Sequence, residues 1–167
     1  MKNIQRVYIA HTINTVAISV IGIYVPIYLL TLGFSLQQVI IYYVISHGSG
    51  VLIGLFVYVP LMRKWGLINT FRLYYPLQIV YLVLLFLLHY RVYPMELVAV
   101  IEGAANYIYW MPLNLLFIRN SAEKEMGSNL GKFFALPKLF GIIGPLIGAV
   151  LIPFIGFWPV FVITAIG

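Results

Sequence analysis

The chain consists almost entirely of long apolar stretches, which single charges and short turns separate. Charged residues make up only 8% of the sequence and hydrophobic residues 63%. A water-soluble domain of this length needs a largely polar surface, which this composition does not supply. About 20 apolar residues cross the hydrocarbon core of a bilayer, so the chain has room for about five or six crossings. We therefore expect an all-α integral membrane protein.

Charges and turn residues divide the chain into expected membrane spans. Arg119 to Lys132 is the one segment that is polar throughout, and we expect it to lie in water as a loop. The last span is about ten residues long where the sequence stops at Gly167, which covers roughly half a bilayer. We therefore expect this helix to be incomplete. The expected spans are residues 7–32, 38–61, 73–88, 95–118, 133–155 and 158–167.

Basic residues fall on one side of the membrane if these spans alternate in direction, and only Arg91 falls on the other side. Cytoplasmic loops carry an excess of Lys and Arg, so this bias predicts a cytoplasmic N-terminus in the cell membrane. It also accounts for the net charge of +6 without a nucleic-acid partner. The residues on the common side are Lys2, Arg6, Arg63, Lys64, Arg72, Arg119, Lys124 and Lys132.

Glycines flank a proline inside the fifth expected span. Gly141, Gly144 and Gly148 recur at steps of three and four residues around Pro145. A proline in a helix removes a backbone hydrogen bond, and glycines on one face let a neighbouring helix approach closely. The pattern predicts a close-packed, slightly kinked helix contact. Generic packing of membrane helices is the alternative interpretation.

Three further segments carry a family pattern: the turn Leu32–Ser35 with Gln38, the loop motif with Arg63, Lys64 and Gly66, and Glu102-Gly103 with Trp110–Pro112. Together with the glycine–proline segment, they resemble the N-terminal six-helix half of a major facilitator superfamily (MFS) transporter, and the resemblance covers nearly the whole chain. It implies an MFS-like helical bundle and a secondary active transporter that moves a small solute by alternating access, coupled to protons or another cation. It also implies a missing C-terminal half or a second copy as partner.

The sequence departs from the family pattern at two places. In the loop motif, Val59 stands at a glycine position and Arg63 at the acidic position. The charge contact that this carboxylate makes in the family must therefore be lost or remade by another group. Ala99 and Val100 stand where the family often has an arginine that is tied to proton coupling. Coupling by the family's usual route is therefore not expected.

Glu102 is the best candidate for a functional residue inside a span. It lies roughly 10 Å from the outer end of the fourth expected span, at 1.5 Å of helix per residue. Ionisable groups within a bilayer are costly and mark functional sites by default. Asn106 and Tyr109 follow at helical spacing. We expect a polar stripe along the substrate path with Glu102 as a proton or cation site. The alternative is an acid that pairs with another helix or is solvated near the outer surface.

Asn14 and Thr15 are further candidates for this path. They lie in the first span with His11 and Ser19, at spacings that place several polar groups on neighbouring faces. The resemblance implies that this helix lines the cavity of a transporter. Hydrogen bonding between helices is the alternative role, worth about 0.6 kcal/mol per contact.

Other chemistries find little support in the sequence. The chain has no cysteine and no aspartate, and its three histidines are scattered. We therefore expect no metal, no cofactor and no enzymatic activity. The absence of a nucleotide-binding loop argues against ATP-driven transport by this chain. The alternative to a transporter is a non-transporting multi-pass protein, such as a half-size subunit or an assembly partner. The expected partners are a small-molecule substrate and the lipid bilayer, with no nucleic acid.

Overall fold

The fold of the chain is helical in the computed structural model, which describes residues 3–166 and contains no strand within them. The expectation of an all-α chain is confirmed. Four segments of the described residues are long and apolar enough to cross a membrane, and they correspond to the first, second, third and fifth expected spans. Lys2 and Gly167, which entered the predictions of orientation and of the last span, lie outside the described residues. The four segments are Ile4–Thr31, Leu36–Trp65, Leu67–Tyr90 and Met126–Ile155.

The fourth and sixth expected spans are helices but are not among these apolar segments. Helix α7 (Met95–Asn120) has 26 residues, enough to cross a bilayer by length. Its polar residues, among them Glu102, Asn106 and Asn114, lower its hydropathy. Helix α10 (Phe157–Ile166) has 10 residues, too few for a crossing. An arrangement of six spans therefore stays a prediction.

Two expected loops contain helices, and these expectations were wrong. Arg63 and Lys64 lie in the last turn of α4 (Val59–Trp65), and α5 (Leu67–Arg72) follows directly after Gly66. The segment 119–132 includes the 3-10 turn η3 (Glu123–Glu125) and the beginning of α8 (Met126–Gly141). Lys, Arg and Glu are good helix formers, so helices continue past the point at which charges begin. Charge therefore does not mark the end of a helix here.

The chain forms two compact units, which we describe separately. Unit 1 comprises Met1–Tyr28 and Leu113–Gly167, and unit 2 comprises Leu29–Pro112. Helices α2 (Val25–Thr31) and α7 contribute to both units.

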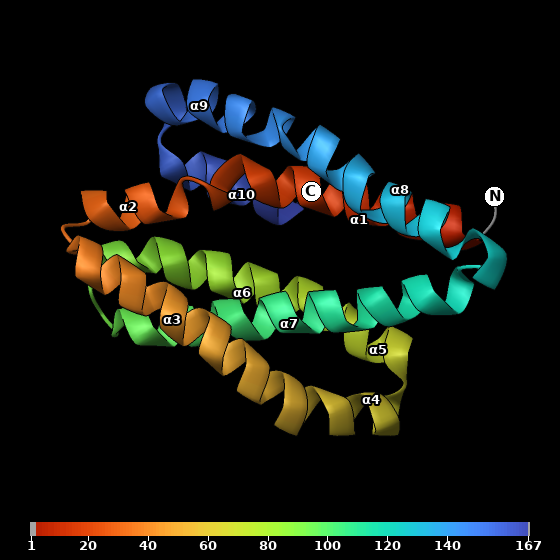
Figure 1. The fold of residues 1–167 in the computed structure, drawn as a ribbon. Coiled ribbons are helices and arrows are strands. Elements are labelled where there is room, and N and C mark those ends of the chain that lie inside the picture. Colours follow the sequence, from red (N-terminus) through yellow and green to blue (C-terminus); the bar gives the residue numbers. More distant parts are fainter. Residues whose placement is uncertain (1–2, 167) are drawn as a thin grey trace. The chain divides into compact units, whose positions relative to one another are not determined.

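Helix α1 (Asn3–Gly22) is the central helix of unit 1. The helices α8, α9 (Ile143–Ile155) and α10 all pack against it (Figure 1). The ring of Phe133 lies between His11 and Phe117, with ring centroids 4.9 and 4.6 Å away. These contacts bury Phe133 completely. Aromatic packing therefore fixes α8 against α1 and the end of α7.

Helices α8 and α9 also carry an exposed apolar stripe, away from their contact with α1. Only 11% of the 18-residue apolar stretch in Met126–Ile155 is buried. In each of the other three segments, 28% of the corresponding stretch is buried. Large apolar residues exposed over so long a surface are unusual in a soluble monomer and fit contact with lipid chains. The stripe consists of Leu139, Ile142, Leu146, Val150 and Phe154.

The first helix that lies wholly in unit 2 is capped at its beginning. The Ser35 side chain accepts a hydrogen bond from the Gln38 N–H, and the Gln38 side chain accepts one from the Ser35 N–H. This capping box ends the turn Leu32–Ser35 and begins α3 (Leu36–Ile53). The remaining elements of unit 2 are the π-helical turn η1 (Gly54–Tyr58), α4, α5, α6 (Tyr74–Leu87), the 3-10 turn η2 (Leu88–Tyr90) and α7 as far as Pro112.

The π-helical turn η1 lets a continuous helical segment accommodate a proline. Pro60 has no N–H and so leaves a carbonyl of the preceding turn without its helical donor. The Val59 N–H donates to the Gly54 carbonyl, five residues earlier, which widens the turn. Helices α3 and α4 are therefore joined without a loop.

Candidate functional site: a carboxyl group at a glycine-lined helix crossing

Helices α3 and α7 approach each other closely in unit 2 because glycines line their contact. A Cβ atom on Gly50 would lie 2.8 Å from the Gly103 carbonyl oxygen. A Cβ atom on Gly103 would collide with the Ser46 carbonyl oxygen, and one on Gly54 with the Tyr107 ring. Because these positions lack side chains, backbone touches backbone at Gly50 and Gly103, and the Tyr107 ring fits against Gly54. The residue before Gly103, Glu102, is thereby placed against α3.

The Glu102 carboxyl group interacts with three side chains of α3, those of Ser46, Tyr42 and His47. Nevertheless, its Oε2 atom is buried and has no hydrogen-bond partner among the described residues. The Ser46 hydroxyl oxygen, which is also buried, has none within the same part of the chain. Buried polar atoms are nearly always hydrogen-bonded, so two unsatisfied oxygens side by side call for an explanation. The carboxyl oxygen can take up a proton there, and the two oxygens together can coordinate a cation.

Tyrosines surround this carboxyl group. The Tyr42 hydroxyl donates to that of Tyr81 on α6 over 3.4 Å, and both side chains are buried. Tyr43 packs its ring edge-on against Tyr42, with centroids 5.2 Å apart. Each of the three interacts electrostatically with Glu102. A phenol can donate to a carboxylate or accept from a carboxylic acid, so the group can serve either state of Glu102.

The other predicted residues of α7 lie in different surroundings. Asn106 is exposed. Tyr109 is buried, and its ring packs against Tyr74 at 4.7 Å and Phe71 at 5.8 Å between centroids. The structure therefore brings Tyr109 together with aromatic residues of α5 and α6, and brings Glu102 together with polar residues of α3.

Sequence reasoning missed Tyr42, Tyr43, Ser46 and Tyr81 as neighbours of Glu102. The first three recur with His47 at steps of three and four residues on α3, which is a local signal of a polar face. Nothing local indicates that α6 supplies Tyr81, since that contact joins residues 39 apart in sequence.

Asn14 and Thr15 belong to unit 1. The Thr15 hydroxyl lies 3.4 Å from Nδ1 of His11, one turn earlier on α1. Its methyl group faces Gly141, where a Cβ atom would lie 3.3 Å from it. Asn14 is partly buried. Thr15 thus contributes to the packing of α1 against α8.

The glycines of the fifth expected span also lie against α1. A Cβ atom on Gly144 would lie 2.8 Å from backbone atoms of Ser19 and Val20, and one on Gly148 would collide with the Val20 carbonyl oxygen. Pro145 lacks the N–H that would bond to the Gly141 carbonyl, and the helix is interrupted at Ile142, between α8 and α9. This interruption follows from the position of the proline.

The residues of the predicted loop motif lie at the surface of unit 2. Arg63 and Lys64 are exposed. Gly66 has φ of +81°, a conformation that L side chains rarely adopt. Its carbonyl accepts a hydrogen bond of 2.9 Å from the Thr70 hydroxyl. Glycine is therefore needed here for the sharp turn from α4 into α5.

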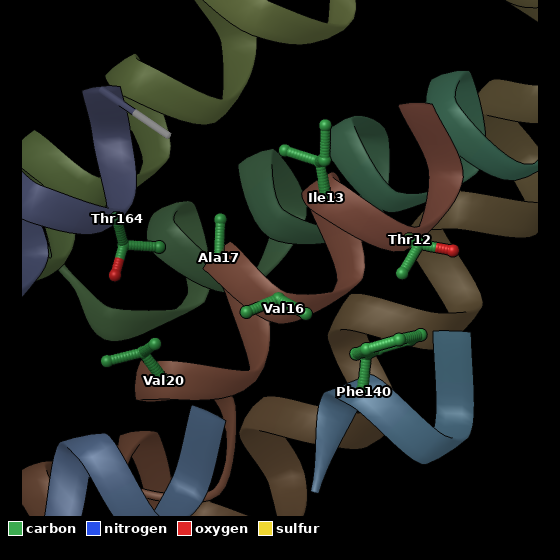
Figure 2. Close-up of a pocket in the computed structure, with 7 residues that line it drawn as sticks. All are labelled: Thr12, Ile13, Val16, Ala17, Val20, Phe140 and Thr164. Carbon is green, nitrogen blue, oxygen red and sulfur yellow. The ribbon is translucent and has the colours of Figure 1, made fainter. Parts of the chain in front are cut away.

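Unit 1 contains an apolar pocket of about 440 Å³ (Figure 2). On the α10 side of the pocket, the Thr164 hydroxyl already donates to the Val160 carbonyl over 2.9 Å. A pocket with so few polar groups suits a hydrocarbon chain better than a polar solute. The side chains that line it come from α1, α8 and α10 and are Thr12, Ile13, Val16, Ala17, Val20, Phe140 and Thr164.

Comparison of the chain with protein-family models, with curated proteins and with solved structures finds no match. Between residues 3 and 166 there is no group of three or more His, Cys, Asp or Glu side chains that could hold a metal ion. The site is therefore interpreted from its own residues.

Proposed function

We propose that this protein is a secondary active transporter of the MFS type, which moves a small solute by alternating access and couples that movement to a proton or another cation at Glu102. The observation that carries the proposal is the Glu102 carboxyl oxygen, buried without a hydrogen-bond partner at the α3–α7 crossing. An ionisable group is expensive at membrane depth, and such groups characteristically lie on proton and ion pathways.

The surroundings of Glu102 support this role. When the carboxyl group is protonated it can donate to a tyrosine or serine oxygen, and when it is ionised it can bind a cation. Both states have neighbours in the Ser46 hydroxyl and the Tyr42 phenol. A change in the protonation of Glu102 therefore changes its hydrogen bonds to side chains of α3, against which it packs. Transporters couple ion binding to a change of helix packing in this way.

The test is solute-driven proton movement in proteoliposomes that contain the full chain and a pH-sensitive dye. We expect at least one compound in a panel of small cations, anions and neutral solutes to move protons across the membrane. Glu102→Gln should reduce this movement at least tenfold and abolish its dependence on pH, whereas Glu125→Gln, at an exposed position, should leave it unchanged. Solute movement that is identical in Glu102→Gln overturns the role of Glu102. If no compound moves protons, the coupling of solute movement to protons is overturned.

The proposed orientation, with the N-terminus in the cytoplasm of a cell-membrane protein, has a separate test. The chain has no cysteine, so a single introduced thiol reports its own side of the membrane. A membrane-impermeant maleimide should label Val92→Cys in intact cells, because Val92 is 77% exposed next to Arg91. Lys64→Cys should react only after permeabilisation. The opposite pattern overturns the orientation.

A further inference from the structure

A second, polar pocket lies at one end of unit 2. It has a volume of about 200 Å³ and is lined in part by Phe34, Gln38, Arg91, Tyr93 and Glu96. Gln38 stands near the beginning of the apolar segment Leu36–Trp65, and Arg91 directly follows the segment Leu67–Tyr90. In a membrane-spanning chain, the ends of apolar segments lie where hydrocarbon gives way to lipid headgroups. The pocket is therefore at headgroup depth.

Arg91 is held in a fixed position in this pocket. Its backbone is left-handed, with φ of 51°. Its guanidinium group lies 5.1 Å from the centre of the Phe34 ring and donates a 2.6 Å hydrogen bond from Nη2 to the Leu32 carbonyl. A guanidinium group has five N–H donors in a planar fork, so donors remain for a ligand.

Glu96 supplies a negative charge to the same pocket. It is exposed in the first turn of α7. Arg91 and Glu96, both within the described residues, form no ion pair with each other, although both line the pocket. Two nearby polar groups are already engaged, since the Tyr93 hydroxyl donates to the Leu84 carbonyl and the Gln38 Oε1 accepts from the Ser35 N–H. The pocket thus presents one cation and one anion, held apart.

We propose that this pocket binds the zwitterionic headgroup of a phospholipid, with the phosphate on Arg91 and a primary ammonium on Glu96. The guanidinium fork matches the geometry of phosphate oxygens, and the carboxylate accepts N–H donors. Pockets that enclose whole ligands measure about 300–1,000 Å³. The smaller volume here fits a headgroup whose acyl chains lie outside, along the apolar helices.

The headgroup carries a primary rather than a quaternary ammonium. Quaternary ammonium groups have no N–H donors and are recognised by open aromatic faces. The Phe34 face is covered by the guanidinium of Arg91. An anionic headgroup without an ammonium would leave Glu96 unmatched. The pocket therefore prefers phosphatidylethanolamine to phosphatidylcholine and phosphatidylglycerol.

Native mass spectrometry of the full chain tests this preference. The delipidated protein is mixed with equal amounts of phosphatidylethanolamine, phosphatidylcholine and phosphatidylglycerol. The mass of each complex then identifies the bound lipid, and the peak intensities give the amount of each lipid that is retained. We expect about tenfold more phosphatidylethanolamine than either of the other lipids, the size of one charge-assisted hydrogen bond. Arg91→Gln should lose all three lipids, and Arg72→Gln, at an exposed position outside the pocket, should retain the preference.

Glu96→Gln keeps the test decisive if Arg91→Gln fails to fold, because Glu96 is exposed and its replacement leaves the packing intact. This variant should lose the preference for phosphatidylethanolamine over phosphatidylglycerol. Equal retention of all three lipids by the wild type, or an unchanged preference in Glu96→Gln, overturns the proposal. Water-soluble glycerophosphoethanolamine should compete poorly. If it displaces the lipid at equal concentration, the pocket takes a soluble zwitterion and the assignment to a lipid is wrong. None of these outcomes depends on transport activity.

Discussion

Each of the two units contains a helix crossing that only glycine permits, but the two crossings differ in chemistry. In unit 1, α9 lies against α1 through Gly144 and Gly148. In unit 2, α7 lies against α3 through Gly103 and Gly50. Both contacts bring backbone against backbone, as small residues do between membrane helices. The polar groups beside the contacts distinguish them.

The two hydroxyl groups beside the crossing in unit 1 both donate to backbone carbonyls. The Tyr24 hydroxyl donates to the Pro145 carbonyl over 2.6 Å, and the Ser19 hydroxyl donates to the Val16 carbonyl over 2.8 Å. The crossing in unit 2 instead carries Glu102 and Ser46, each with a buried oxygen that has no partner in the described chain. The first crossing shows that close packing requires no ionisable group. Packing alone therefore does not account for Glu102, and this difference is the main reason to assign it a function.

The largest effect should come from alanine at the glycines whose Cβ would meet backbone, and Gly103 and Gly144 test one such position in each unit. Gly103→Ala and Gly144→Ala should each lower the free energy of unfolding by about 2–3 kcal/mol, because neither neighbouring backbone can yield without moving its helix. Unfolding in mixed micelles of increasing SDS content measures this. The matched control is Gly48→Ala on α3, where a Cβ atom meets nothing within 4 Å. It should be neutral or stabilising, by up to about 1 kcal/mol. Equal results for Gly48→Ala and Gly103→Ala would contradict the close approach in unit 2.

Gly141→Ala should have a smaller effect than Gly144→Ala on the same helix contact. A Cβ atom on Gly141 would lie 3.3 Å from the Thr15 methyl group, which is a side chain and can shift. We expect a loss of about 1 kcal/mol or less in the same unfolding assay. A loss as large as that of Gly144→Ala would show that α8 is held as tightly as α9.

Removal of one phenol from each unit should give a pair of still smaller, similar losses. Tyr24→Phe removes the bond to the Pro145 carbonyl, and Tyr58→Phe removes the 2.9 Å bond to the Ala104 carbonyl. Interhelical hydrogen bonds in membranes contribute about 0.6 kcal/mol on average, so we expect a loss of this size for each. A loss above about 1.7 kcal/mol for only one of these two variants would mean that the crossing in its unit depends on polar contacts rather than on glycine.

The smallest effect on stability should come from Glu102→Leu, although we expect this residue to matter most for function. One carboxyl oxygen of Glu102 is buried without a hydrogen-bond partner among the described residues, and replacement of such a group by an apolar one of similar size is often neutral or stabilising. The free energy of unfolding should therefore stay equal or rise in the SDS assay, while proton movement in proteoliposomes disappears. A clear destabilisation would mean that Glu102 is structural, and would remove the contrast between the two crossings.

Local patterns predicted part of this molecule well. The apolar stretches indicated the helices, and the spacing of Gly141, Gly144 and Gly148 indicated a close contact in which the structure places the last two against α1. The position of Glu102 deep within an expected span singled out this acid. Each of these features lies within one helix, where a period of 3.6 residues relates sequence to surface.

The rest depends on which helices meet, and no local pattern determines that. Tyr81 reaches Tyr42 from another helix, and Tyr109 shares a helix face with Glu102 but packs into a different cluster. Hydropathy does not identify α7 as a membrane span, because its polar residues, which include the candidate Glu102, make it less apolar. Charge suggested loops at 62–72 and 119–132, and both segments contain helices instead. Partner choice and helix ends are set by tertiary packing.

Helix α9 also bears on how this protein can change over evolutionary time. On one side, Gly144 and Gly148 touch backbone, and every larger residue is excluded by distance. On the other side, Leu146, Val150 and Phe154 are exposed. If lipid is their neighbour, any apolar residue of any shape suffices there. Substitutions should therefore accumulate along one edge of the helix and stop at the other. A set of related sequences would then show, without any coordinates, which edge faces protein.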